Sequence, residues 1–342
     1  MNAALRNVPA PAAAGRATMQ AIVQRRYGTE PEDLFRLEQI AKPVPARGEV
    51  LIRVAAAGVD RGTWHLMAGL PYLARIAGFG VRAPKIPVPG WAVAGTVEAV
   101  GEDVTELAPG DEVFGTCRGS FAQYATCKAS RLAPKPASLT FEQAAAIPNS
   151  AVAALRAVRD HGKVQPGQHV LVIGASGGVG TFAVQIAKTF GAEVTGTCST
   201  AKMDLVAAVG ADHVLDYTRE DPAKNRYDVI IDIGGNRRLT HLRRALTQQG
   251  TLVITGGEDG GHWFGAALGR NVAAHLLNPF TRQRLTGFIA PESRADLLVL
   301  RDLAESGAIT PAIDRTYPLS QAAAAVRHLA DGHARGKVVI TV

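Results

Sequence analysis

The sequence predicts an α/β protein with two domains and a cleft between them. Its 342 residues exceed what one hydrophobic core usually supports. Short segments with the pattern of strands fill the first part of the chain, whereas continuous apolar runs alternate with helical patterns after Pro148. We therefore expect a β-rich domain beside a doubly wound, parallel six-stranded sheet, with ligands bound in the cleft.

The β-rich domain is predicted over residues 19–145. Its strand-like runs are broken by Gly and Pro, and they read QAIVQRRY, EVLIRVAAAG, AVAGTVEAVG, DEVFGT and FAQYATC. A long connection from His65 to Gly90 is rich in Gly, Pro and aromatic residues, and such connections often border a site. Residues 291–342 contain two amphipathic helical patterns and a final strand, KVVITV, and we expect this tail to return to the same domain.

Residues 146–290 are predicted to form the second domain, a βαβ array. Six runs are apolar enough to be strands buried on both faces, namely HVLVIG, EVTGTC, HVLDY, DVIIDIGG, GTLVITGG and RLTGFIA. Between the first two runs, apolar residues recur at helical spacing from Val179 to Phe190, and Gly191 follows as a stop signal. Such an array favours a Rossmann sheet with strand order 3-2-1-4-5-6.

The segment GASGGVG follows the first of these strands and opens a helix, which is the context that a dinucleotide-binding turn requires. Its glycines allow the backbone to approach a pyrophosphate and allow the helix to pack closely on the strand, while the helix N-terminus faces the phosphates. The cofactor-binding candidates in this turn are Ala175, Ser176, Gly177, Gly178, Val179 and Gly180. A tight turn without a ligand is the alternative, and the intact strand, turn and helix favour the nucleotide.

The end of the second strand favours NADPH over NADH. An acid at this point would bind the ribose 2′-hydroxyl, but EVTGTC is followed by Ser199, Thr200 and Lys202, with no acid before Asp204. Two hydroxyls and an ammonium group suit a 2′-phosphate. Ser199 and Thr200 are also typical caps of a following helix, and the two roles are compatible.

Charge and composition indicate an ordinary globular protein. Its 37 Lys and Arg residues against 30 Asp and Glu residues give a net charge of +7, with no Lys/Arg run longer than two. Such a field attracts polyanions, but no nucleic-acid module accompanies it, so we expect a nucleotide ligand and no nucleic-acid partner. Three cysteines without a CxxC pair favour a reducing, cytoplasmic setting.

Neither a membrane span nor a folded leader is expected. The longest uncharged stretch that could be tested as a span contains Pro166 and a glycine cluster, so a strand followed by a turn explains it better. Residues 1–18 hold two arginines and no acid, as transit peptides do, but they lack serine and contain Pro9 and Pro11. We interpret them as a disordered extension ahead of a strand that begins near Met19.

With these features in place, the chain resembles the medium-chain dehydrogenase/reductase superfamily, in particular its zinc-free quinone oxidoreductase, or zeta-crystallin-like, branch. The resemblance runs from Met19 to Val342 and rests on PGWAVAGTVEAVG, PGDEVFG, QPGQHVLVIGASGGVGTFAVQIAK, GADHVLDY and HARGKVVITV. It implies a GroES-like catalytic domain, a cofactor in the interdomain cleft and a homodimer formed through the Rossmann sheets.

The resemblance also implies roles for single residues. Ser199, Lys202 and Tyr217 would surround the adenosine 2′-phosphate. The turn after Ile233 would border the nucleotide, and Lys337 would approach the cofactor.

The zinc alcohol dehydrogenases of this superfamily place a Cys, a His and a second Cys around a catalytic metal. The matching positions here hold Asp60, Trp91 and Asn149, so one natural ligand at most remains of the three that a catalytic zinc needs. The clustered cysteines of a structural zinc lobe are missing as well. We therefore expect no metal, and we assign Trp91 and Asn149 to the substrate pocket.

The segment VDRGTW departs from the VNPxDW of many relatives. The usual amide becomes Asp60 and the usual acid becomes Thr63, which puts substrate choice in question. For Asp60 we weigh two interpretations equally, a catalytic role or an ion pair with Arg61 or another basic group.

The same region supplies the remaining site candidates, because it is expected to face the nicotinamide. Trp64 and His65 are assigned to the substrate pocket. Tyr72 is the candidate hydrogen-bond donor to a developing oxyanion and is, with Asp60, the predicted catalytic pair.

Without zinc, no Lewis acid polarises an isolated carbonyl, whereas a quinone or an α,β-unsaturated carbonyl carries its own electron sink. We therefore predict hydride transfer from NADPH to a small apolar acceptor of this kind, with the proton supplied by solvent or a weak local acid. Two alternatives remain: a zinc-independent alcohol or carbonyl dehydrogenase, and an NADPH-binding sensor or structural protein with low turnover.

Overall fold

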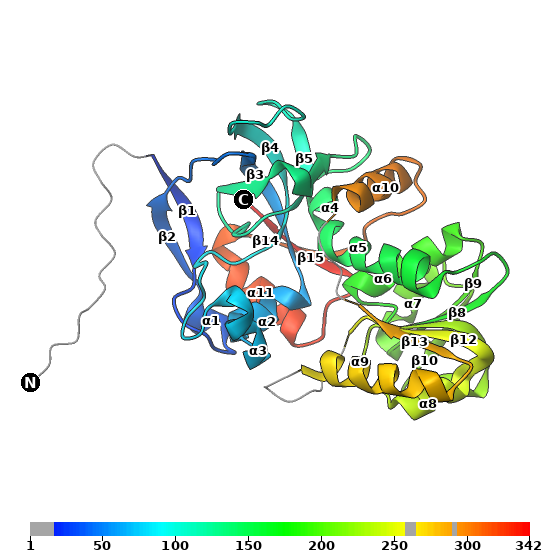
Figure 1. Cartoon of the computed structure of the whole chain (residues 1–342). Helices are drawn as coiled ribbons and strands as arrows, with labels where there is room; N and C mark the ends of the chain where they lie inside the picture. The colour runs from blue at the N-terminus through cyan, green and yellow to red at the C-terminus, as the bar shows by residue number, and fades with distance from the viewer. Residues whose placement is uncertain (1–16, 257–264, 289–292) are drawn as a thin grey trace, which may run out of the picture.

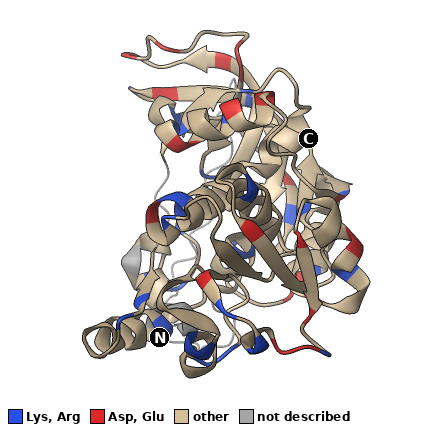
Figure 2. Ribbon diagram, turned by 90° about the vertical axis from the view of Figure 1, so that its right-hand side faces the viewer, with Lys and Arg blue, Asp and Glu red and all other residues tan. Residues whose placement is uncertain are grey.

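The computed structural model describes residues 17–256, 265–288 and 293–342, and it has the predicted α/β fold with two domains. Figure 1 shows the β-rich domain on the left and the nucleotide-type domain on the right. Figure 2 shows acidic and basic residues interspersed over both domains. Among the described helices, none is long and apolar enough to cross a membrane.

The β-rich domain is built on a seven-stranded sheet, with a two-stranded antiparallel sheet beside it. The order in the larger sheet is β14-β15-β3-β4-β5-β7, with β6 paired to β3. Its strands are β3 (Glu49–Val59), β4 (Ala92–Val100), β5 (Glu112–Thr116), β6 (Tyr124–Lys128), β7 (Leu132–Pro134), β14 (Ile313–Pro318) and β15 (Lys337–Thr341), and the smaller sheet pairs β1 (Thr18–Val23) with β2 (Arg36–Ala41). The C-terminal strand β15 therefore pairs with β3 and returns the chain to the first domain.

The helices of this half are α1 (Pro31–Leu34), α2 (Arg61–Ala68), α3 (Tyr72–Ala74), α4 (Phe141–Ala146), α5 (Pro148–Arg156), α10 (Arg294–Glu305) and α11 (Ala322–Ala330). The predicted β-rich domain therefore also contains short helices between its strands. Helix α4 begins at a capping box, in which Thr140 and Gln143 exchange hydrogen bonds between side chain and backbone. Three alanines of α4 are buried against the sheet, and their small size allows the close approach.

The second domain is a parallel sheet of six strands in the order β10-β9-β8-β11-β12-β13, which confirms the predicted order 3-2-1-4-5-6. Its strands are β8 (His169–Ile173), β9 (Glu193–Cys198), β10 (His213–Asp216), β11 (Tyr227–Asp232), β12 (Leu246–Ile254) and β13 (Arg284–Gly287). The helices are α6 (Gly178–Thr189), α7 (Met203–Ala208), α8 (Leu239–Ala245) and α9 (Gly265–Leu277). Helix α6 ends where the sequence predicts, before Gly191 at φ +75°.

The first strand differs from the sequence prediction at both of its ends. The first strand, predicted as QAIVQRRY, ends at Val23, because the Gln24 side chain turns inward and donates to Met67 O at 2.8 Å. This strand begins at Thr18, and Ala17 O accepts from Lys42 N at 2.8 Å, so the last residues of the predicted leader belong to the fold. Residues 1–16 lie outside the described residues.

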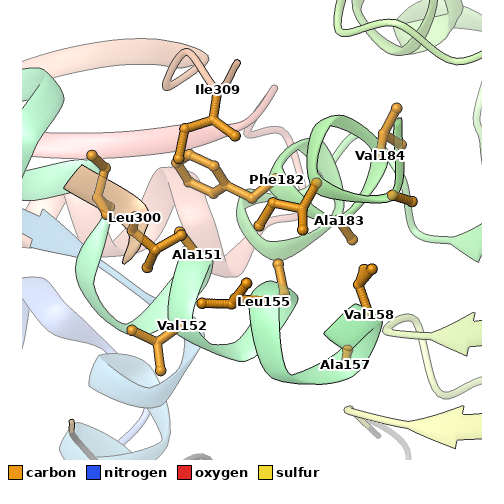
Figure 3. Close-up of a cluster of buried hydrophobic side chains, with 14 of the residues drawn as sticks. Ala151, Val152, Leu155, Ala157, Val158, Phe182, Ala183, Val184, Leu300 and Ile309 are labelled. Carbon is orange, nitrogen blue, oxygen red and sulfur yellow. The ribbon is translucent and has the colours of Figure 1, made fainter. Parts of the chain in front are cut away.

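Apolar packing holds α5 against α6 and so fixes the N-terminal ends of both helices. Figure 3 shows Leu155 of α5, Phe182 of α6 and Leu300 of α10 in one cluster. The exposed fraction of each of these residues is 1 % or less. Close packing of this kind makes the relative position of the helices rigid. Both helices begin at the interdomain cleft, so this cluster positions the residues of their first turns.

A buried carboxylate secures α10. Asp296 is 4 % exposed. It accepts from Arg156 Nε at the end of α5 and from a terminal nitrogen of Arg159, in the π-helical turn Ala157–Gly162 that follows, both at 2.7 Å. Two partners and low exposure make this a strong interaction, unlike a surface ion pair.

We expect Asp296→Ala to lower the free energy of unfolding by about 2–3 kcal/mol, because it takes the carboxylate partner from Arg156 and leaves Arg159 with Asp160 alone. Urea unfolding measures the loss. The control is Asp302→Ala on the same helix, whose side chain is 66 % exposed and which should change stability by less than about 0.5 kcal/mol. Equal losses in the two variants would contradict this account.

Candidate active site

A cleft of about 640 Å³ lies between the two domains and is lined by residues from both. The structure brings most of the sequence-predicted site residues to its wall: Asp60, Trp91, Asn149, Ser176, Gly177, Gly178, Val179, Lys202, Ile233 and Lys337. Asp60, Trp91 and Asn149, which the resemblance aligned with zinc ligands, thus come together in space from three separate parts of the chain.

Eight predicted residues are not among those that line this cleft, and three of them come from the segment expected to face the nicotinamide: Trp64, His65 and Tyr72. Thr63 and Leu66 of α2, three positions apart, share its cleft-facing side, whereas Trp64 and His65 do not line the cleft. The pocket role of Trp64 and His65 stays a prediction. Trp64 packs against the apolar cluster behind α2. The Arg75 guanidinium lies over the Tyr72 ring, 4.7 Å from its centroid, and Tyr72 is not among the residues that line the cleft, so its role as oxyanion donor stays a prediction.

The glycine turn has the geometry of a nucleotide-binding turn. A Cβ at Gly180 would lie 2.1 Å from Gly174 O, so only glycine allows α6 to pack on β8 at this distance. A Cβ at Gly178 would lie 2.8 Å from Lys337 Cδ, and this contact brings the two domains together. Helix α6 begins at Gly178 without a side-chain cap, so its first N–H groups and its positive dipole end remain available for phosphate.

The loop between α11 and β15 closes over this turn. Gly336 N donates to Ser176 O at 2.8 Å, and Gly177 forms a parallel bridge with Gly336. The candidate nucleotide site is therefore built from both domains, and the β-rich domain contributes residues from the C-terminal tail.

Two cations meet beyond the end of β9, where the sequence predicts the 2′-phosphate. Lys202 Nζ donates to Gly332 O and Ala334 O, both at 2.8 Å, and Arg335 donates to Ala201 O at 2.6 Å. Burial lowers the pKa of Lys202, the carboxylate of Asp314 raises it, and repulsion by Arg335, which is itself paired with Asp204, lowers it. An anion between them would relieve that repulsion.

The other residues predicted for this region lie around the same strand ends. Tyr217 N donates to Cys198 O at 3.1 Å, and its side chain is 48 % exposed. Thr200 donates to buried Asp216, so this acid at the end of β10 is already engaged by hydroxyls. Ser199 stands directly before the 3-10 turn Thr200–Lys202. The glycine turn, the free helix N-terminus and the two cations together fit a dinucleotide.

A buried ion pair forms the floor of the cleft. Lys337 is 2 % exposed and donates to Asp60, to Ser150 Oγ at 3.1 Å and to Val59 O at 3.2 Å. Asp60 also accepts from Asn149 Nδ2 at 2.9 Å and from Ser150 Oγ at 2.8 Å.

Burial alone would raise the pKa of Asp60. The Coulombic attraction of Lys337 and hydrogen bonds from Lys337, Asn149 and Ser150 outweigh burial and lower the pKa below its usual value. Asp60 is therefore an ionised carboxylate held by three partners. Of the two interpretations weighed for this residue, the ion pair is the one observed, and its partner is Lys337 rather than Arg61.

A catalytic zinc does not fit these residues. The carboxylate of Asp60 already neutralises an ammonium group at the position of the first ligand, and the Trp91 side chain has no atom that ligates zinc at the position of the second. Within the described parts of the chain, no three His, Cys, Asp or Glu side chains gather as a metal site would require.

Sequence reasoning missed Ser150, Arg335 and the pairing of Asp60 with Lys337. Antiparallel pairing of Val338 with Val59 puts Lys337 beside Asp60, and these two residues are 277 positions apart. No local pattern reports such a contact. For Arg335 the sequence offered one weak signal, a basic residue two positions before Lys337 in HARGKVVITV.

Comparison with known proteins gives the same picture. Residues 46–137 match the family described as alcohol dehydrogenase GroES-like domain, and residues 209–340 match the one described as zinc-binding dehydrogenase. The mouse mitochondrial NAD(P)H oxidoreductase RTN4IP1 is 31% identical over 95% of this chain and 89% of its own length.

The names of two further similar proteins specify an acceptor. A 2-methylene-furan-3-one reductase of Solanum lycopersicum is 31% identical over 90% of this chain and 76% of its own length. The solved structure of a quinone oxidoreductase from Coxiella burnetii superposes with a TM-score of 0.84 at 26% identity, covering 95% of this chain and 100% of the other. The chain thus belongs to the medium-chain dehydrogenase/reductase superfamily and, with its nicotinamide-type cleft, is an oxidoreductase of the quinone oxidoreductase branch.

Proposed function

We propose that this protein transfers a hydride from NADPH to a quinone or an α,β-unsaturated carbonyl without a metal. The observation that carries the proposal is the Asp60–Lys337 ion pair, which occupies the position where a zinc enzyme of this superfamily holds its first ligand. Because no Lewis acid is held there, the acceptor has to supply its own electron sink.

The residues that would hold NADPH come from both domains. The first turn of α6, after Gly177, would bind the pyrophosphate, and Lys202 with Arg335 would bind the 2′-phosphate across the gap between the domains. The cofactor, when bound, supplies the hydride. Ile233 and Gly234 would border the nicotinamide half, since both line the cleft next to the glycine turn.

The cleft wall supports a small apolar acceptor. Trp91, Leu66, Val152 and Leu297 line it, so an aromatic or enone ring would be held by apolar contact. Two relatives whose names specify a quinone oxidoreductase and a 2-methylene-furan-3-one reductase support this acceptor class. Asp60 remains ionised beside Lys337, so the final proton would come from solvent.

We also propose a homodimer and a reducing, cytoplasmic setting. Strand β13 ends the six-stranded sheet on one side, and nearby Val272, Leu276 and Phe280 are 53%, 66% and 86% exposed, which supports pairing with a second copy. Sedimentation equilibrium would decide this. All three cysteines are free and buried, in keeping with a reducing compartment.

The first test is NADPH oxidation by chelator-treated protein with a quinone, cyclohex-2-enone and a saturated ketone, each repeated with NADH. We expect turnover of the quinone or the enone, and none of the saturated ketone, because the ketone lacks an internal electron sink. Turnover of the ketone alone would indicate an alcohol or carbonyl dehydrogenase instead. Absence of any turnover with tight NADPH binding would indicate a sensor or structural role.

The cofactor preference has its own test. We expect Lys202→Ala and Arg335→Ala each to lower kcat/KM for NADPH by about 10- to 100-fold and to change that for NADH by less than about 3-fold, since a charge-assisted hydrogen bond is worth about 1.5–3 kcal/mol. The control is Lys224→Ala, an exposed lysine in the same domain. Parallel losses with both cofactors would mean that these cations do not read the 2′-phosphate.

Asp60→Asn separates a structural role from proton transfer. Since the folded-state pKa of Asp60 is lowered, its ion pair stabilises the protein above the unfolded-state pKa of about 3.9, and this contribution is lost as the pH falls through the folded-state pKa. We expect Asp60→Asn to lose about 1–3 kcal/mol at pH 7 and to converge with the wild type once the pH falls below the folded-state pKa of Asp60.

Activity of the same variant completes the test. A general base contributes about 10²- to 10⁴-fold, so a structural Asp60 predicts that Asp60→Asn keeps kcat within about 10-fold of the wild type. A loss of kcat beyond about 10²-fold, with NADPH affinity unchanged, would return Asp60 to the catalytic role.

A further inference from the structure

Two buried hydroxyls in the cleft wall have no hydrogen-bond partner. Thr63 is 3% exposed and Thr116 is 4% exposed, and among the described residues the Oγ1 atom of neither meets a donor or acceptor. Both residues line the interdomain cleft. They come from different elements, Thr63 from the first turn of α2 and Thr116 from the last position of β5.

A buried hydroxyl without a partner destabilises a fold, so its retention needs an explanation. Thr63 N donates to Asp60 O at 2.9 Å, so the backbone at this position is engaged while the side chain is not. A methyl group in place of either hydroxyl would fill the same volume without an unmet polar atom. A ligand that accepts a hydrogen bond in the cleft would satisfy both groups.

Trp91 lines the cleft together with the two threonines and lies next to Thr116. Its neighbour Ala92 pairs with Thr116 across β4 and β5, and Trp91 O accepts from Cys117 N at 2.8 Å. Thr63, Leu66 and Trp91 also line a second, mainly apolar cavity of about 60 Å³ on the far side of this wall. The hydroxyls therefore lie where a polar atom of a ligand would be surrounded by apolar surface.

We propose that the Thr63 and Thr116 hydroxyls donate hydrogen bonds to the carbonyl oxygen of the acceptor and are the groups that orient it and stabilise its developing negative charge. The inference rests on the proposed function and assigns its oxyanion site, which the sequence had given to Tyr72. The ligand class is a compact enone or quinone whose apolar part meets Trp91 and Leu66.

The chemistry balances with the groups named. For an enone, the hydride from NADPH forms a C–H bond at the β-carbon, the C=C π electrons move toward the carbonyl oxygen, and an enolate oxygen accepts from the two hydroxyls. A proton from water then adds at the α-carbon and restores the carbonyl. The hydroxyls keep their protons throughout, so their contribution is electrostatic.

The test compares cyclohex-2-enone with cyclohexene, a hydrocarbon of the same ring size that lacks the oxygen. Binding to the protein–NADP⁺ complex is measured by ligand-observed NMR for the wild type and for Thr63→Val, Thr116→Val and the double variant. We expect the wild type to prefer the enone, each valine to reduce that preference about 3- to 10-fold, and the double variant to abolish it. Thr63→Ser and Thr116→Ser keep the hydroxyl and should therefore retain the preference for the enone.

Stability and kinetics complete the design. If the hydroxyls serve the ligand, the valine variants keep or raise the Tm of the unliganded protein, since an unmet buried polar atom is removed. With the enone as substrate, kcat should fall in the valine variants and recover in the serine variants, while the Kd for NADPH stays constant. A lower Tm or an unchanged preference for the enone would overturn the proposal.

Two outcomes separate this inference from the proposed function. A preference for the enone that depends on the hydroxyls, in a wild type that does not oxidise NADPH, would retain the oxyanion site and reject the reductase. Turnover of the enone that is unaffected by the valines would retain the reductase and reject the oxyanion site. Weaker NADPH binding in the valine variants, with the preference for the enone intact, would assign the hydroxyls to the cofactor and would also reject the proposal.

Discussion

The buried ion pair between Asp60 and Lys337 is the interaction on which the cleft depends. Removing both charges from water is costly, and the cost is offset because Ser150 and Asn149 add hydrogen bonds to the same carboxylate. The pair joins the end of β3 to the start of β15 and contacts the first turn of α5. It therefore fastens two strands and one helix, which are distant in the sequence, to one another at the floor of the cleft.

The same pair decides what chemistry the cleft can support. An ammonium group beside Asp60 keeps that carboxylate ionised and bound by Lys337, Asn149 and Ser150. What the wall offers instead is apolar surface around Trp91 and two hydroxyls, Thr63 and Thr116, whose hydrogen-bonding capacity is unused within the described structure. Apolar surface and free hydroxyls together support the proposed acceptor class, a quinone or an α,β-unsaturated carbonyl.

Predictions from the sequence succeeded where the physics was local or periodic. The six apolar runs predicted the strand order because strands buried on both faces and joined by helices can be wound in few ways. They did not foresee which side chains line the cleft in the segment after Asp60, where Trp64, His65 and Tyr72 were expected at the cofactor. Helix α2 presents Thr63 and Leu66 to the cleft, and the direction in which a short helix faces depends on packing that the segment does not encode alone.

By itself, the sequence determined the parallel sheet, the glycine turn and the absence of an acid after the second strand, because each follows from residue type and spacing within a few positions. Only the tertiary structure decided the partners of Asp60, the approach of Arg335 to Lys202 and the placement of Thr63 and Thr116 in the wall of one cleft. These contacts join residues tens to hundreds of positions apart. Their energies depend on burial and distance, which exist only after the two domains have folded together.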